Sequence, residues 1–101
     1  MAKAKYQQYF DQMMKENQEL FDQFRPIHER YKQNNEAHQA EFNQQGKQVR
    51  RVIQQWDRKL CSVMGRSSYD VYSQQVSEKF WDLVRQEFDQ IDMIGVTISY
   101  Q

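Results

Sequence analysis

The sequence predicts an all-α protein, an antiparallel bundle of three helices with a long central helix and a short extended C-terminal tail. Three Gly and one Pro leave few tight turns for an all-β fold, while Gln, Glu, Lys, Met and Leu favour helices. Apolar residues also recur three and four positions apart along three segments. At 101 residues, the chain is expected to form a single helical domain over residues 1–101.

The first helix is predicted over residues 3–24, where an aromatic stripe recurs at helical spacing. The stripe consists of Tyr6, Tyr9, Phe10, Met13, Met14, Phe21 and Phe24. Pro26 is expected to end or kink this helix, because proline has no N–H group and disfavours the helical conformation at Arg25 before it.

A central helix is predicted over residues 27–64, about 57 Å long at 1.5 Å per residue. Its core seam recurs every seven residues at Phe42, Val49, Trp56 and Val63. We expect Trp56 to anchor the core where this helix meets the last one. Gly46 is the weakest point; we expect the helix to continue through it, since no proline accompanies it, and the alternative is four helices if the chain breaks at Gly46.

The last helix is predicted over residues 70–92, after the break Gly65-Arg66-Ser67-Ser68 and before Gly95. The tail 96–100 alternates apolar and polar residues like a strand. We expect it to lie extended over the helices or to pair with another copy of the chain.

Charge is balanced overall, with 14 basic and 14 acidic residues, but residues 46–66 carry a net charge of +5 and residues 67–101 a net charge of −4. The candidate surface for an anion or nucleic acid consists of Lys47, Arg50, Arg51, Arg58 and Lys59, with Trp56 available to stack on a base. We expect instead that the acidic last helix folds back on these residues and neutralises them. Nucleic acid is therefore the alternative partner and not the expected one.

The sequence shows no catalytic constellation, so we expect no enzyme activity, cofactor or metal. A possible metal set consists of His28, Glu29, Glu36, His38 and Glu41, because His38 and Glu41, three apart on a helix, could share an ion. The Glu-x-x-His pairs of di-iron bundles, however, do not occur. The lone Cys61 has no histidine near it in sequence and is interpreted as a small apolar side chain. No apolar stretch is long enough to span a bilayer and no secretory signal is evident, so we expect a cytoplasmic protein without a membrane partner.

The aromatic content favours self-association. Six Phe, six Tyr and two Trp are more than a three-helix core readily encloses, and Phe80 and Trp81 cannot both point inward. Phe42 is expected to lie on a bare part of the central helix. The sequence thus predicts a non-catalytic structural or protein-interaction module, a homodimer or a binder of another protein, with an interaction surface at Phe42, Phe80 and Trp81.

Overall fold

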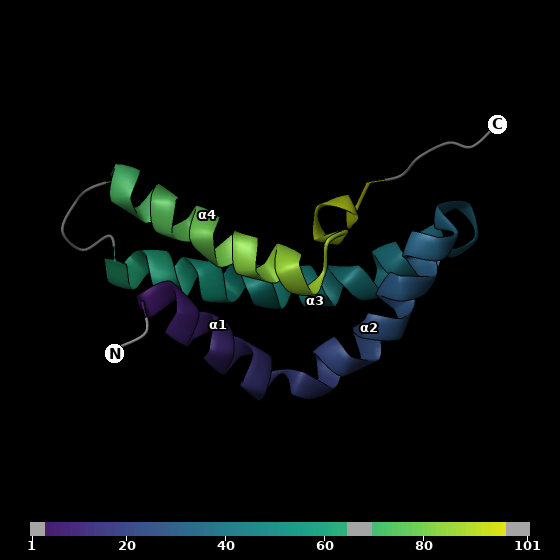
Figure 1. Ribbon diagram of the computed structural model, residues 1–101, viewed down its shortest axis with the longest axis horizontal. Coiled ribbons are helices and arrows are strands. Elements are labelled where there is room, and N and C mark those ends of the chain that lie inside the picture. Colours follow the sequence, from purple (N-terminus) through teal and green to yellow (C-terminus); the bar gives the residue numbers. More distant parts are fainter. Residues whose placement is uncertain (1–3, 65–69, 97–101) are drawn as a thin grey trace.

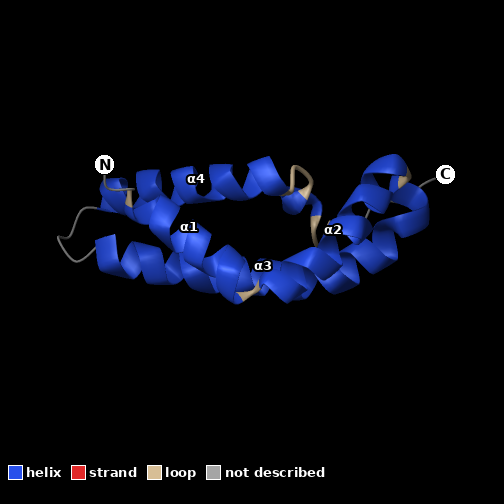
Figure 2. Ribbon diagram, turned by 60° about the horizontal axis from the view of Figure 1, so that its bottom comes forward, coloured by secondary structure: helices blue, strands red, loops and turns tan. Residues whose placement is uncertain are grey.

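The computed structural model describes residues 4–64 and 70–96, which form helices joined by short connections (Figures 1 and 2). The elements are α1 (Lys5–Glu16), α2 (Gln18–Gln33), α3 (Asn35–Met64), α4 (Asp70–Glu87) and the short 3-10 helix η2 (Ile91–Met93). No strand occurs within these residues, and the predicted all-α class with a long central helix is confirmed. The described chain holds four α-helices where we predicted three.

The bundle is elongated, with extents of 49 × 26 × 20 Å. Helix α3 is its axis: α2 packs along the N-terminal half of α3, and α1 packs against both α3 and α4 (Figure 1). T-shaped ring contacts mark the position of α1, with Tyr9 against Trp56 of α3 at 6.1 Å and Phe10 against Phe80 of α4 at 6.3 Å. Helix α4 runs antiparallel to α3 and completes the core.

The predicted helix end at Pro26 is wrong, because α2 continues through this proline. A proline inside a helix costs about 3 kcal/mol. Helix α2 buries Phe21, Phe24 and Tyr31, and each large apolar side chain that is buried contributes about 1.5–3 kcal/mol. Packing of this face therefore outweighs the cost of Pro26, which lies exposed on the helix surface.

The first interruption lies at Asn17 instead, between α1 and α2. Its backbone leaves the helical region (φ −119°, ψ 28°), and its side-chain amide donates a hydrogen bond to the carbonyl oxygen of Met13 at 3.0 Å. Asparagine competes for helix hydrogen bonds in this way. The resulting bend lets α1 and α2 follow α3 along most of its length.

The predicted helix over 27–64 is also wrong in its first part, since the chain reverses at Asn34. The side chain of Asn34 accepts a hydrogen bond from the N–H of Ala37 (3.1 Å) and caps α3, while the amide of Asn35 donates to the carbonyl oxygen of Tyr31 (2.9 Å) and caps α2. The reversal stacks the rings of Tyr31 and Phe42 at 3.9 Å. One continuous helix would hold those residues about 17 Å apart along its axis.

Helix α3 continues through Gly46, as expected, because this glycine is a packing site and not a break. A Cβ atom at Gly46 would lie 2.7–2.9 Å from three side-chain carbons of Ile94. The segment carrying Ile94 follows α4, which ends at Glu87 and not at residue 92 as predicted. Side chains of α3 hold that segment: Asn43 accepts from the N–H of Gly95 (2.9 Å) and donates to the carbonyl of Val96 (3.1 Å).

Of the predicted tail, only Val96 falls within the described residues, and the strand-like stretch 97–100 lies outside them, as does the break at 65–68. Gly95 adopts a positive φ of 86°, which favours glycine and turns the chain after η2.

The predicted core seam of α3 is only partly buried. Trp56 is buried as predicted, but Val63 of the same predicted seam is 43% exposed. The seam therefore leaves the core before the end of α3.

Candidate anion-binding surface

Among the described side chains, no acidic residue of α4 or of the turn after it forms an ion pair with the basic half of α3, so the expected neutralisation within one chain is wrong. Glu87 pairs with Arg25 (3.1 Å) and Asp89 with Lys32 (3.0 Å), both on α2. Arg85 of α4 pairs with its own neighbours, Asp92 at 2.8 Å and Asp82 at 3.2 Å. Each of these carboxylates therefore pairs with a cation of α2 or α4, and none of them pairs with a cation of α3.

Four cations of α3 and two glutamines between them form one surface, which we call the basic face. It consists of Lys47, Arg50, Arg51, Gln54, Gln55 and Arg58, which recur three and four positions apart along the helix. Together with Ile94 and Gly95 these residues line an open groove of about 500 Å³. Lys47 and Arg58 stand about 17 Å apart along the helix axis. Within the described residues, none of the four cations forms an ion pair with a carboxylate.

Two of these cations are positioned by backbone oxygens. Arg50 Nη1 donates to the carbonyl of Ile94 at 3.2 Å, and Arg58 Nε lies 3.5 Å from the carbonyl of Gln54. Each guanidinium keeps further N–H groups for a ligand. Lys59, which we included in the predicted surface, instead places its Nζ over the ring of Trp56 at 4.6 Å. Trp56 is 8% exposed, so it cannot serve as the predicted platform for a base.

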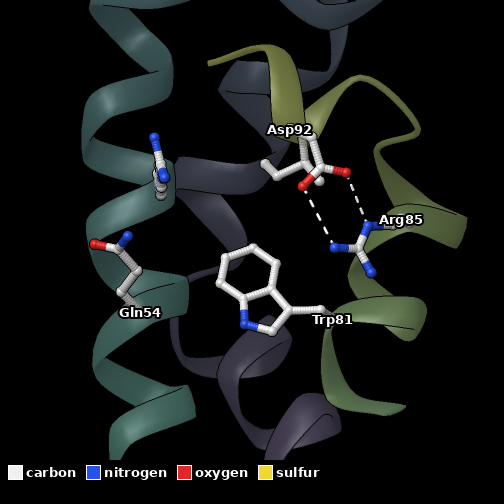
Figure 3. Close-up of a pocket in the computed structure, with 6 residues that line it drawn as sticks. Gln54, Trp81, Arg85 and Asp92 are labelled. Carbon is white, nitrogen blue, oxygen red and sulfur yellow. Dashed lines mark hydrogen bonds and ion pairs between the residues drawn. The ribbon is translucent and has the colours of Figure 1, made fainter. Parts of the chain in front are cut away.

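A second hollow adjoins the basic face where α3 faces α4 and η2 (Figure 3). This pocket of about 230 Å³ is lined by Arg50, Gln54, Trp81, Arg85, Ile91 and Asp92. Arg85 binds Asp92 through two nitrogens, Nε at 2.8 Å and Nη2 at 3.4 Å, so that one wall of the pocket is an ion pair. Arg50 and Gln54 line both hollows, so the groove and the pocket are adjacent on one surface.

A polar cluster around Asp57 fixes Trp81. One carboxylate oxygen of Asp57 accepts hydrogen bonds from Ser77 Oγ (2.8 Å) and Cys61 Sγ (3.6 Å), and the other accepts from Trp81 Nε1 (3.2 Å). Burial and the adjacent carboxylate of Asp57 raise the pKa of Cys61. A thiol with a raised pKa is a poorer nucleophile, so the cluster favours a structural role for Cys61.

The predicted aromatic interaction surface does not exist as an exposed patch. Phe42 and Phe80 are fully buried within the single chain. Phe42 lies under α2 in contact with Phe24 and Tyr31, because the reversal at Asn34 covers the part of α3 that we expected to be bare. Trp81 is only partly buried against the core, so it is the member of the Phe80-Trp81 pair that points outward.

His28, which the sequence suggested only as part of a possible metal set, is a buried polar residue of the core. Its ring lies 2% exposed among Phe24, Phe42 and Phe88. Nε2 accepts a hydrogen bond from the backbone N–H of Gln90 at 3.1 Å, which ties α2 to the turn after α4. Burial lowers the pKa of His28 despite the nearby carboxylates of Glu29 and Asp89, so the neutral ring is the stable form.

His38 and Glu41 do not form a metal centre with a third ligand: no group of three or more His, Cys, Asp or Glu side chains suited to a metal ion occurs in the described residues. Glu41 instead pairs with Arg30 at 2.8 Å. None of the described helices is sufficiently long and apolar to span a membrane.

Sequence reasoning identified the four cations of the basic face but missed the pocket beside them. Gln54, Arg85 and Asp92 come from separate elements, and no spacing along the chain relates them. Trp81 was singled out, but as an exposed contact for a second copy. No family model, curated protein or solved structure matches the chain.

Proposed function

We propose that this chain is a non-catalytic helical module that binds a polyanionic partner through the basic face of α3. The observation that supports the proposal is the group of four exposed cations, Lys47, Arg50, Arg51 and Arg58, that have no carboxylate partner among the described residues. Three of the acidic residues expected to neutralise them, Glu87, Asp89 and Asp92, pair elsewhere. A ligand can therefore engage these cations without breaking an internal ion pair.

The composition of the basic face suits a phosphate-rich partner better than a protein. Protein interfaces are rich in aromatic side chains and poor in charge at their centres, whereas nucleic-acid interfaces are more polar and strongly positive. Among the described residues, the exposed large hydrophobic side chains are Val63 and Val96. Three of the four cations are arginine, whose planar fork suits phosphate oxygens. The homodimer predicted from the sequence loses its support, because the aromatic rings that suggested it are covered within one chain.

The test is a binding titration with a fluorescein-labelled thymidine decamer across a salt series. Four phosphate contacts to a single strand give a slope of about −2.8 in log K against log salt, or about a 50-fold loss of affinity between 50 and 200 mM salt. The variant Arg51→Gln/Arg58→Gln removes two contacts and should reduce the slope to about −1.4, or about a 7-fold loss. Glutamine favours helices, so the fold should be retained.

A matched control removes the same charge elsewhere. Lys5→Gln/Lys15→Gln changes two exposed lysines of α1 and should leave the slope unchanged. Equal loss of binding in both double variants would mean that net charge matters and the basic face does not. If wild type binds neither the decamer nor polyglutamate at 50 mM salt, the proposed function is overturned.

A further inference from the structure

We propose that the ligand of the basic face is duplex DNA, and that the outer ridge of α3 enters the major groove and contacts the base edges there. This inference rests on the proposed function and specifies its ligand. It assigns separate tasks to the side chains of one helix: cations at the flank of the ridge hold phosphates, and the cations and amides along the ridge face the bases.

The ridge is one row of exposed polar side chains on α3. Successive residues of a helix are rotated by about 100°, so that six residues between 44 and 62 lie within about 40° of Arg51 around the axis. All six are exposed: Gln44, Lys47, Arg51, Gln55, Arg58 and Ser62. The row from Lys47 to Arg58 spans about 17 Å, the length of about five base pairs at 3.4 Å each.

No carboxylate opposes a DNA ligand on this ridge. Asp57 is the one acidic residue of the sequence between residues 43 and 64. Its carboxylate accepts hydrogen bonds from Ser77 Oγ at 2.8 Å and Trp81 Nε1 at 3.2 Å, both on α4. The acid therefore faces the neighbouring helix, and the ridge presents only cations, amides and a hydroxyl.

The amides on the ridge distinguish base edges from other anions. Gln44 and Gln55 are exposed, and neither side chain bonds another group within the described residues. A glutamine amide offers a donor beside an acceptor, and adenine presents the complementary pair, N7 and N6, in the major groove. Guanine presents two acceptors there, which suit a guanidinium such as that of Arg51. The anionic groups of polyphosphate or polyglutamate only accept, so they leave the amide carbonyls unmatched.

The flank of the ridge supplies phosphate contacts. Arg50 lies about 100° from Arg51 around the helix, on the side of the C-terminal segment, where its Nη1 donates to the carbonyl of Ile94 at 3.2 Å. Ile94 and Gly95 line the open groove of about 500 Å³ together with the basic face. This groove gives one sugar-phosphate backbone a place beside the ridge. Recognition helices of DNA-binding proteins use the same division between base and backbone contacts.

The basic face favours a duplex over a single strand, because it offers no open aromatic ring on which a free base packs. Trp56 is 8% exposed, and Trp81 is packed against the core. Proteins that bind single strands rely on such rings. The ridge also favours DNA over double-stranded RNA. The major groove of B-form DNA is about 12 Å wide and admits a helix, whereas that of A-form RNA is deep and narrow.

The experiment begins with selection of bound molecules from a pool of random 16-base-pair DNA duplexes at 50 mM salt. We expect enrichment of a motif of about five base pairs that contains adenine and guanine. The selected DNA should bind about 5-fold to 150-fold more tightly than an RNA duplex of the same sequence and equal charge, since one bidentate base contact contributes about this factor.

Two variants of equal charge locate the contact. Gln55→Ala removes an amide from the ridge and should lower the affinity for the selected DNA by about 5-fold to 150-fold, with the salt slope unchanged. Gln45→Ala is the matched control, because Gln45 is an exposed glutamine of the same helix that lies about 120° from Arg51 around the axis. It should bind as wild type does. Alanine favours helices, and circular dichroism melts verify that both variants fold.

The outcomes separate this inference from the proposed function. Equal affinity for the DNA and RNA duplexes, or a selection without an enriched motif, overturns groove recognition and leaves polyanion binding intact. Tighter binding of the thymidine decamer or of polyglutamate than of the selected duplex also overturns it, and identifies a single strand or an acidic protein as the partner. Equal losses in Gln55→Ala and Gln45→Ala refute the ridge as the contact surface. If wild type binds none of these probes, the proposed function is overturned as well.

Discussion

The close approach of Ile94 to Gly46 predicts that Gly46→Ala destabilises the protein although alanine is the better helix former. The added methyl would lie 2.7–2.9 Å from three carbons of Ile94, a side chain that is 2% exposed. Overpacking of this kind costs about 1–3 kcal/mol. Replacing an interior helical glycine by alanine returns about 1 kcal/mol. We therefore expect a net loss of up to about 2 kcal/mol, with the melting temperature lowered by about 4–8 °C for each kcal/mol lost.

The sign of the effect should reverse when Ile94 is shortened. In an Ile94→Ala background all three crowding carbons are gone, so Gly46→Ala should stabilise by about 1 kcal/mol. Ile94→Ala alone should cost about 2–5 kcal/mol through loss of buried surface. Urea denaturation of wild type, the two single variants and the double variant gives the coupling energy, which should be about 1–3 kcal/mol. If Gly46→Ala stabilises the protein by the same amount in both backgrounds, Ile94 does not pack on Gly46 and the reasoning is refuted.

Three further predictions concern single side chains. Because burial lowers the pKa of His28, the unfolded chain binds the proton more readily; wild type should lose stability as pH falls below about 6.5, whereas His28→Gln should show a smaller slope between pH 7 and 5 in urea melts. Asn34→Ala should cost about 1 kcal/mol in the same assay through loss of the α3 cap, and no loss would refute the capping role. Trp56→Ala should cost about 3–5 kcal/mol, and a melting temperature within two degrees of wild type would contradict its burial.

The all-α class could be predicted from the sequence because helical periodicity is local, and the same is true of the continuous helix through Gly46. The two asparagine breaks could not. Asn17 and Asn34 interrupt otherwise periodic segments, and whether such a residue turns the chain depends on what the following stripe packs against. The tendency of Pro26 to end the helix was overestimated for the same reason, because its local cost in free energy is outweighed by the buried face of α2.

The sequence correctly shows which stretches of the chain are basic and which are acidic, but the ion pairs predicted between them were wrong. Counting residues shows that 46–66 is basic and 67–101 acidic, but ion pairs depend on how α4 is rotated about its axis. The observed rotation presents Glu87 to Arg25, and the turn after α4 brings Asp89 to Lys32. Such a rotation follows from the packing of Phe80, Val84 and Phe88, and the charged residues themselves contain no signal for it.

The single-residue reversal at Asn34 also bears on where the chain tolerates a change in length. Each residue inserted inside α3 would rotate everything after it by about 100°, and so one extra residue between Asn35 and Gly46 would turn the basic face away from solvent. Seven extra residues would nearly restore the rotation, at the cost of two more turns of helix. Residues added at Asn34 itself only lengthen a surface turn, where longer connections cost little. Length variants of this protein that keep the fold should therefore carry their insertions at that turn.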